Sequence, residues 1–310
     1  MAEFAAETPG RLGTALLFRR GFGGDTANFI VAAARMGGRC GYVTRVGDDE
    51  FGRAFLALWD REGVDRSRVV VEREGRTAVY FIARREEGGH DFTYYRAHSP
   101  ASRLQPGDLD RGYLAGARVL HTSGITQAIS VSALAAVEAA LDIAAAAGVA
   151  VSYDVNARPR LWSIDAARAA AERACGRAQL VFLSAEDAAH LYPGAGGEEV
   201  ARRILDRGPR AVVLKQGAAG CTLFPAGRPP VRLPGWAVDA VDTTGAGDAF
   251  AGAFVAAWLA GSGFEEAAAL ANAAGALTTT GLGAVTPIPD RQAVAAFIQT
   301  RQTAVHTRKE

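Results

Sequence analysis

The feature that most constrains the fold is a regular alternation of two kinds of segment after about residue 118. Short apolar runs rich in β-branched residues alternate with alanine-rich stretches that are long enough to form helices. Strands separated by such helices form parallel βαβ units, whose sheet is covered by helices on both faces. The predicted strands are 118–122, 149–154, 180–183 and 211–215, and the predicted helices are 131–148, 164–177, 185–191, 198–207 and 246–260.

This pattern predicts an α/β protein with a mostly parallel central sheet flanked by helices. Residues 69–96 depart from it, because they alternate with period two and contain no helix between the turn signals Glu74-Gly75 and Gly88-Gly89. We expect this segment to be an antiparallel meander that projects from the sheet as a small β lid or as a dimerisation surface. Ligands of a parallel sheet bind beyond the carboxyl ends of its strands.

Composition and net charge limit the kinds of molecule that the protein is expected to bind. The 310 residues carry a formal net charge of +1, which gives no electrostatic reason to expect nucleic acid or an anionic membrane. Cys40, Cys175 and Cys221 are odd in number and form no CxxC motif, so they are expected to be buried thiols in a reducing compartment. The first residues resemble no signal peptide. We therefore expect one domain over residues 1–310, a cytoplasmic location and small-molecule chemistry.

The stretch DTTGAGDAF, residues 242–250, predicts an anion site. Gly245 and Gly247 allow backbone amides to point at an anion, and the following helix adds its positive end. The loop is not a Walker A sequence, because no Lys-Ser/Thr follows the glycines. It is not a dinucleotide-binding fingerprint either, because Phe250 stands where the third glycine should be. Asp248 falls in the first helical turn, where the dipole favours its charged form. It could orient a substrate hydroxyl for phosphoryl transfer, or it could simply cap the helix.

A second glycine-rich stretch, residues 19–28, leads into a predicted helix over 29–36. Gly24 would allow a ligand to approach the backbone closely, and Asp25 and Asn28 could bind vicinal hydroxyls. The alternative is a turn in which Asp25 or Thr26 is the helix N-cap.

Together these stretches resemble a known family. GGDTANFIVAAARMG and DTTGAGDAFAGAF are similar to the paired signatures of the ribokinase-like (PfkB) carbohydrate kinases, and the resemblance extends from about residue 10 through the chain. Residues 46–52 match its G-x-D-x-x-G segment, residues 215–220 its K-x-G-x-x-G segment, and residues 271–275 its adenine-side helix. The resemblance implies a ribokinase-like fold in which residues 69–96, with part of 11–22, form the β lid. It also implies a homo-oligomer assembled through that lid.

The resemblance implies the following roles. Asp248 is the base, and the amides of Gly245, Ala246 and Gly247 form an anion hole. ATP and Mg²⁺ are the expected cofactors, with a monovalent cation such as K⁺ as a further candidate. The family's N-x-x-E segment appears here as Ser184-Ala-Glu-Asp187, so Asp187 is the candidate metal residue, acting through water. The residues expected near the nucleotide are Ser184, Lys215, Gly217, Gly220, Asp242, Thr243, Gly245, Gly247 and Asn272.

Within the family, residues 92–102, 123–126 and 154–162 resemble the substrate segments of 2-keto-3-deoxygluconate kinases. The resemblance implies that Arg96 and Arg158 hold the carboxylate, since a guanidinium can grip it with two parallel hydrogen bonds. The C6 hydroxyl would face Asp248, and the remaining substrate-binding residues would be Gly24, Asp25, Asn28, Tyr80 and Tyr94. Three alternatives remain: the arginines are solvated surface residues, the substrate is a neutral sugar of a fructokinase or ribokinase, or the protein is a non-catalytic sugar sensor.

The resemblance also raises a question at the amino terminus. Family members usually begin with a strand that ends in Gly-Glu or Gly-Asp before the segment that matches residues 1–4 here. Either the start has been assigned too late or this strand is mostly absent. We therefore expect a gap beside a central sheet position, with reduced stability or solubility of the chain as printed.

Overall fold

The computed structural model describes residues 1–85 and 89–307, with side chains as far as residue 301. Its largest layer is a six-stranded sheet in the order β12-β11-β10-β9-β8-β7. The strands β7 to β10 are parallel, and β11 and β12 extend the sheet in antiparallel fashion. The predicted α/β class and its four strands are confirmed, whereas β11 and β12 were not predicted. The bounds are β7 Val119–Ser123, β8 Ala150–Asp154, β9 Leu180–Ser184, β10 Ala211–Lys215, β11 Gly220–Pro225 and β12 Val231–Pro234.

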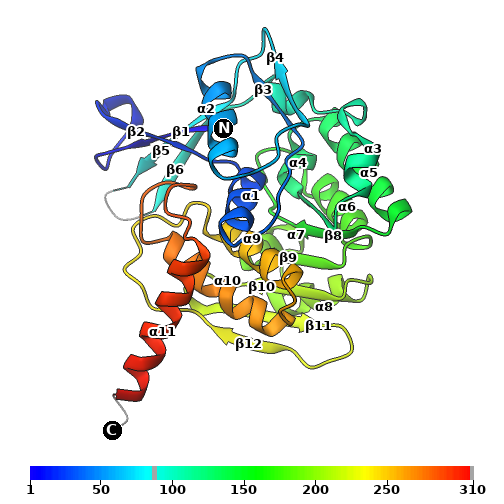
Figure 1. The fold of residues 1–310 in the computed structure, drawn as a ribbon, viewed down its shortest axis with the longest axis vertical. Coiled ribbons are helices and arrows are strands. Elements are labelled where there is room, and N and C mark those ends of the chain that lie inside the picture. Colours follow the sequence, from blue (N-terminus) through cyan, green and yellow to red (C-terminus); the bar gives the residue numbers. More distant parts are fainter. Residues whose placement is uncertain (86–88, 308–310) are drawn as a thin grey trace.

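Helices cover both faces of this sheet (Figure 1). In β9, Val181 and Leu183 belong to the core shared with α5 to α8, whereas Leu180 and Phe182 belong to the core shared with α1, α9 and α10. This alternation is the period-two geometry of a strand buried on both sides. The bounds are α1 Asp25–Arg35, α5 Val131–Ala147, α6 Ile164–Cys175, α7 Ala185–Leu191, α8 Gly197–Leu205, α9 Ala246–Leu259, α10 Phe264–Thr278 and α11 Arg291–Thr307.

A second sheet, which we call the lid sheet, projects beside the main body (Figure 1). Its order is β2-β1-β5-β6, with β1 parallel to β5 and the other two pairs antiparallel. The amino-terminal strand therefore lies inside the lid sheet, which the sequence did not predict. The predicted turn at Gly88-Gly89 includes Gly88, which lies outside the described residues. The bounds are β1 Ala2–Ala6, β2 Phe18–Phe22, β5 Val79–Arg84 and β6 His90–Tyr95.

The expectation that an antiparallel meander begins at residue 69 is wrong. β4, Val69–Glu72, pairs in parallel with β3, Thr44–Gly47, and these two strands form a separate sheet. A short apolar run does not reveal its partner, because parallel and antiparallel neighbours both accept β-branched residues. The remaining short elements are α2 Glu50–Arg61, α3 Arg111–Ala115, α4 Gly124–Ala128, η1 Leu12–Thr14, η2 Pro100–Arg103, η3 Pro106–Asp108 and η4 Gly217–Ala219. Within the described part of the chain, no helix combines the length and apolar character needed to cross a membrane.

The helices α1 and α9 pack at unusually close range, and a glycine allows it. A Cβ added at Gly252 would lie 2.4 Å from Phe29 O and 2.8 Å from Ala32 Cβ, so α1 could not keep its position. The contact brings the first turn of α1 beside the first turn of α9, from which the polar residues of the candidate site extend.

We predict that Gly252→Ala lowers the free energy of unfolding by about 1–3 kcal/mol. Its higher helix propensity, worth about 1 kcal/mol, offsets only part of the clash. Urea unfolding measures the change. Gly116→Ala is the matched control, because its Cβ would meet only ordinary contacts at 3.5 Å and 3.6 Å. Equal stability of the two variants would contradict the close packing of α1 on α9.

Candidate active site

The candidate site lies at the carboxyl edge of the six-stranded sheet. Ser123, Asp154, Ser184 and Lys215 are the last residues of β7, β8, β9 and β10, and these strands are parallel. All four side chains therefore lie at one edge, where the amino ends of α1 and α9 also lie. Parallel sheets bind ligands at this edge.

The loop before α9 has the backbone conformation of an anion site. Gly245 is left-handed, with φ of 77°, and an added Cβ would lie 2.8 Å from Ala284 O, so only glycine fits there. α9 begins at Ala246, so the amides of Gly245 and Gly247 lie at the positive end of a helix. The Ala246 amide forms only a long turn bond, of 3.3 Å, to Thr243 O. A Cβ placed on Gly247 would lie 3.3 Å from Lys215 Nζ, so an ammonium adds to this positive potential.

Asp248 is held in this loop by two amide side chains. Asn28 Nδ2 donates to its Oδ2 at 2.8 Å, and Asn156 Nδ2 donates to its Oδ1 at 3.4 Å. Burial raises the pKa of Asp248 to about 7, with Asp25 and Asp154 adding to the rise and Asn28 and Lys215 opposing it. The expectation that the helix dipole keeps this carboxyl's pKa low is therefore wrong, because desolvation outweighs the dipole. A carboxyl with a pKa near neutrality suits a general base.

Lys215 and Asp154 form an ion pair in the site, with 2.6 Å between Nζ and Oδ2. Burial by itself lowers the pKa of the Lys215 ammonium, but Asp154, Asp187 and Asp248 together raise it above its usual value. The ammonium therefore remains charged beside Gly247. Asp154 Oδ1 is buried without a hydrogen-bond partner in the described structure, so this carboxylate can accept one more donor or ligand.

The glycine-rich stretch before α1 also contributes to the site. α1 begins at Asp25, four residues earlier than predicted, and its N-cap is Gly24, which has φ of 129° and makes no side-chain capping bond. The alternative in which Asp25 or Thr26 caps the helix is therefore wrong. Ser123 Oγ donates to Asp25 Oδ2, and the buried Asn28 reaches Asp248. Both of the predicted polar residues thus face the carboxyl edge of the sheet.

The lid sheet and the loop after β8 contribute the predicted substrate residues. The Arg96 guanidinium lies 4.7 Å from the Tyr94 ring centre, and Tyr94 stacks on Tyr80 at 5.7 Å. Arg158 is exposed and donates to Ala157 O at 2.8 Å. Burial lowers the pKa of Arg96, and the positive charge of Arg158 contributes to this lowering. Neither arginine forms an ion pair with a described carboxylate, so both can bind an acidic ligand.

The Tyr80 hydroxyl is less available to a sugar than the sequence indicates. Its hydroxyl donates to Glu3 Oε2, and Glu3 also accepts from the Ala284 amide at 3.2 Å. Burial raises the pKa of Glu3 to about 7, with the Tyr80 hydrogen bond opposing the rise. Tyr80 therefore connects the lid sheet to the loop before residue 285, and its ring can support Tyr94 without itself bonding a sugar.

The predicted nucleotide and metal residues fall into two groups. The first group, Lys215, Gly245 and Gly247, lies together at the loop before α9. Asp187 is buried, and its oxygens accept from Ala157 N, Ser184 N and Ser184 Oγ at 2.6–2.9 Å, which forms a capping box for α7. Its direct role in the structure is thus to hold the loop after β8 against α7. No group of three or more His, Cys, Asp or Glu side chains suited to a metal is found among the described residues.

The other predicted nucleotide residues are mainly structural in their visible contacts. Asp242 is buried and accepts from Thr244 and from the Gly283 amide at 2.9 Å, while Thr243 beside it is exposed. Asn272 donates to Leu233 O and Pro234 O at 3.3–3.4 Å. A Cβ on Gly220 would lie 2.2 Å from Leu233 O, so Asn272 and Gly220 meet at the end of β12. Gly217 begins η4 with φ of 58°.

The sequence interpretation placed Asp154 and Asn156 in a substrate segment without giving either a role, and it missed Glu3. The role of Asp154 could have been inferred, since it is the polar end of a predicted strand whose neighbouring strand ends are also polar. Asn156 has a positive φ of 37°, which cannot be read from a sequence. Glu3 lies in an apolar run whose position in the lid sheet was not predicted.

A parallel sheet with a lid sheet beside its carboxyl edge is the ribokinase-like fold, and solved structures of that class match it. A putative ribokinase II from E. coli, solved with ATP and Mg²⁺, superimposes with a TM-score of 0.89 at 26% identity, covering 96% of each chain. The chain belongs to the pfkB family of carbohydrate kinases, whose model matches residues 2–291. The resemblance found in the sequence is thus confirmed.

Two groups of relatives are similarly close to the chain. A 2-dehydro-3-deoxygluconokinase from Thermoproteus tenax is 37% identical over 281 residues, covering 89% of this chain and 85% of the relative. The probable fructokinase-5 from Arabidopsis thaliana is 32% identical over 300 residues, covering 93% of this chain and 92% of the relative. The comparisons thus identify a carbohydrate kinase and leave its sugar to be argued from the site.

We predict that Asp248→Asn stabilises the protein at pH 8 relative to the parent chain. The folded pKa of about 7 exceeds the unfolded one, so ionising this carboxyl costs stability as pH rises between these two values. The stability difference between the variant and the parent should therefore grow by up to about 1.4 kcal/mol per pH unit up to pH 7, and then level off. Thermal unfolding at pH 5.5, 6.5, 7.5 and 8.5 measures it. A difference that is independent of pH would contradict the burial of this carboxyl.

Proposed function

We propose that the protein phosphorylates the C6 hydroxyl of 2-keto-3-deoxygluconate with ATP, which gives 2-keto-3-deoxy-6-phosphogluconate. The observation that carries the choice of sugar is the pair Arg96 and Arg158: the charge of Arg158 acts on Arg96, and neither forms an ion pair with a carboxylate among the described residues. A sugar acid would supply that partner, and a neutral sugar would not. The similarity to the gluconokinase of Thermoproteus tenax supports the same choice.

The chemistry follows from the arrangement around Asp248. The C6 oxygen forms a bond to the γ-phosphorus, its proton passes to an Asp248 carboxylate oxygen, and the bond from the γ-phosphorus to the bridging oxygen of ADP breaks. The transition state of such a transfer is loose, so positioning and electrostatic stabilisation dominate. The amides of Gly245, Ala246 and Gly247 and the Lys215 ammonium would face the transferred group, and Asn28 and Asn156 would keep the carboxyl oriented through their hydrogen bonds to it.

The residues present fit ATP with Mg²⁺. Mg²⁺ in kinases is usually held by one or two carboxylates, by waters and by the substrate phosphates, so no three-carboxylate cluster is needed. At the carboxyl edge of the sheet, Asp154 Oδ1 has no hydrogen-bond partner among the described residues. The negative charge of Asp187 is close enough to contribute to raising the pKa of Asp154. When bound, Mg²⁺ would neutralise phosphate charge, and we propose Asp187, acting through water, as its protein contact. Asp242, Thr243, Ser184, Gly217, Gly220 and Asn272 would line the nucleotide side, and K⁺ is a candidate activator.

The lid sheet is our candidate for a subunit interface. Leu16 and Leu17 are exposed just before β2, and Tyr95 is exposed at the end of β6. Exposed large apolar side chains can mark contact surfaces. We propose a cytoplasmic homo-oligomer that uses this surface.

A fructokinase is the second candidate, because fructokinases are similarly close relatives. The two differ at the arginine pair, which an uncharged ketose does not need. A non-catalytic sensor is less well supported, because it would not need Asp248, the glycine loop and Lys215 to lie together at one edge of the sheet.

We predict that Arg158→Ala raises the KM for 2-keto-3-deoxygluconate about tenfold to a hundredfold, which corresponds to the loss of one charge-assisted contact. The KM for fructose should not change. An assay coupled to ADP release, run with a panel of keto sugar acids and neutral hexoses, measures both. Arg111→Ala is the control, since Arg111 is an exposed arginine on the distant helix α3. Turnover of fructose alone, or an unchanged KM for the acid, would overturn the choice of sugar.

A further inference from the structure

Glu3 is a buried carboxyl of the lid sheet to which the proposed mechanism gives no role. It lies in β1 and is only 2% exposed. A carboxyl is costly to bury unless hydrogen bonds compensate. Two donors reach its Oε2 atom, the Tyr80 hydroxyl and the Ala284 amide, the latter at 3.2 Å. The carboxyl therefore joins a lid strand to a segment that is 281 positions away in the sequence.

Two glycines make room for the other oxygen of this carboxyl. A Cβ added at Gly21 would lie 2.6 Å from Glu3 Oε1, and a Cβ added at Gly283 would lie 2.5 Å from the same atom. Gly21 belongs to β2, and Gly283 has φ of 88°, in the left-handed region that favours glycine. The Glu3 carboxyl thus occupies a slot between the lid sheet and residues 279–288, which we call the bridging loop.

The bridging loop also supports the loop before α9, residues 242–247, which we call the anion loop. The Gly283 amide donates to Asp242 Oδ2 at 2.9 Å. Ala284 O lies only 2.8 Å from the position that a Cβ on Gly245 would take. The bridging loop therefore contacts the buried carboxyl on one side and the anion loop on the other.

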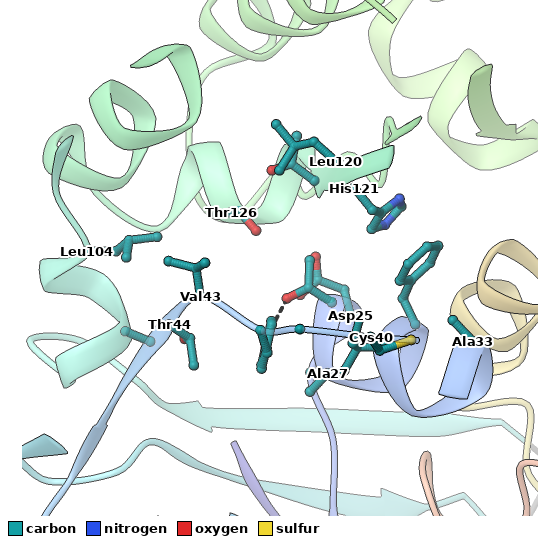
Figure 2. A pocket seen from close by; sticks show the side chains of 18 of the residues that line it. Asp25, Ala27, Ala33, Cys40, Val43, Thr44, Leu104, Leu120, His121 and Thr126 are labelled. Atoms are coloured by element: carbon teal, nitrogen blue, oxygen red, sulfur yellow. Dashed lines mark hydrogen bonds between the residues drawn. The ribbon is translucent and has the colours of Figure 1, made fainter. Parts of the chain in front are cut away.

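Tyr80 continues this connection toward the predicted sugar side of the site. Its ring stacks on Tyr94, and Tyr94 lies beneath the Arg96 guanidinium. Arg96 lines a cavity of about 950 Å³, and Figure 2 shows Asp25 at the same cavity. Glu3 is not among the described residues that line this cavity. It can therefore act on the reaction only through the residues that it holds.

We propose that Glu3 is a positioning residue for phosphoryl transfer. Its carboxylate fixes the bridging loop, which in turn holds the amides of the anion loop where the transferred phosphoryl group requires them. Catalysis of such a transfer is mostly positioning and electrostatic stabilisation. The inference rests on the part of the proposed function that assigns phosphoryl transfer to the anion loop, and it does not depend on the choice of sugar.

The first test compares the turnover of Glu3→Ala and Glu3→Gln with that of the parent chain, using whichever sugar of the panel the parent phosphorylates. Glutamine keeps a carbonyl oxygen that can accept a hydrogen bond, whereas alanine keeps none. We expect kcat to fall about tenfold to a hundredfold in Glu3→Ala, because a displacement of about 1 Å can cost about that much. Glu3→Gln should recover most of the loss. The KM for the sugar should change less than kcat, since Glu3 touches no substrate.

Gly21→Ala tests the same contact without changing Glu3. The added Cβ would press on the end of the Glu3 side chain, which can move, so the chain should fold with the carboxyl displaced. We expect kcat to fall in this variant as well. Its result decides the question if Glu3→Ala does not fold, and an unchanged kcat in a folded Gly21→Ala would then overturn the proposal.

Ile204→Ala is the matched control. Ile204 is buried near the end of α8, from which the chain returns to the amino end of β10, so it lies at the sheet edge opposite the candidate site. We expect this variant to lower the thermal midpoint and to leave kcat unchanged. A loss of kcat as large as that of Glu3→Ala would overturn the proposal, because general destabilisation would then explain both.

Amide hydrogen exchange without any substrate gives a second test. Gly283 and Thr244 both donate to Asp242. Glu3→Ala should speed exchange at these two amides about tenfold or more, beyond any change in β8 and β9. Unchanged exchange there, or a parent-like kcat in Glu3→Ala, would overturn the proposal. If the parent phosphorylates no sugar, the proposed function fails, while the exchange result still decides whether Glu3 holds the anion loop.

Discussion

The candidate site depends first on how closely α1 packs against α9. Gly252 lets the backbone of α1 approach α9 to a distance that no side chain would allow, with Phe29 O and Ala32 Cβ directly above it. This contact brings Asn28 within 2.8 Å of Asp248 and places Asp25 beside the end of β7. Two glycine loops that are about 220 residues apart in the sequence thus form one site. A wider spacing of the helices would leave Asp248 without the amide that orients it.

The site also depends on the charged side chains that surround Asp248. Four carboxyl groups, Asp25, Asp154, Asp187 and Asp248, lie near one another at the edge of the sheet, with Lys215 as the cation among them. Desolvation and mutual repulsion raise the pKa of Asp248, whereas Lys215 lowers it and adds positive charge at the anion loop. Repulsion that would be unfavourable in a structural cluster is useful in a kinase, because a carboxyl that is half protonated near neutral pH can accept a proton from a hydroxyl.

Much of the fold could be predicted from the sequence. Four strands were predicted correctly, because buried parallel strands are continuous β-branched runs between helices. They lie at 118–122, 149–154, 180–183 and 211–215. The pairing of strands was harder to predict, because strands that are far apart in the chain leave no local signal of their partner. Residues 69–72 (β4) were assigned to the lid, and β1 was not expected in the lid sheet. In the site, the glycine loops located Asp248 and Asn28. The raised pKa of Asp248 and the Glu3–Tyr80 contact depend on burial by distant segments, which the local sequence does not encode.

The central claim is that Asp248 receives the proton of the hydroxyl that is phosphorylated. Its most direct test is the turnover of Asp248→Asn, since asparagine keeps the shape of the side chain and its bond to Asn28 but cannot serve as the base. The account predicts that kcat falls by about 10²–10⁴ while the affinity for the sugar acid, measured by calorimetry, stays within a few-fold of the parent value. Full turnover by this variant would contradict the account.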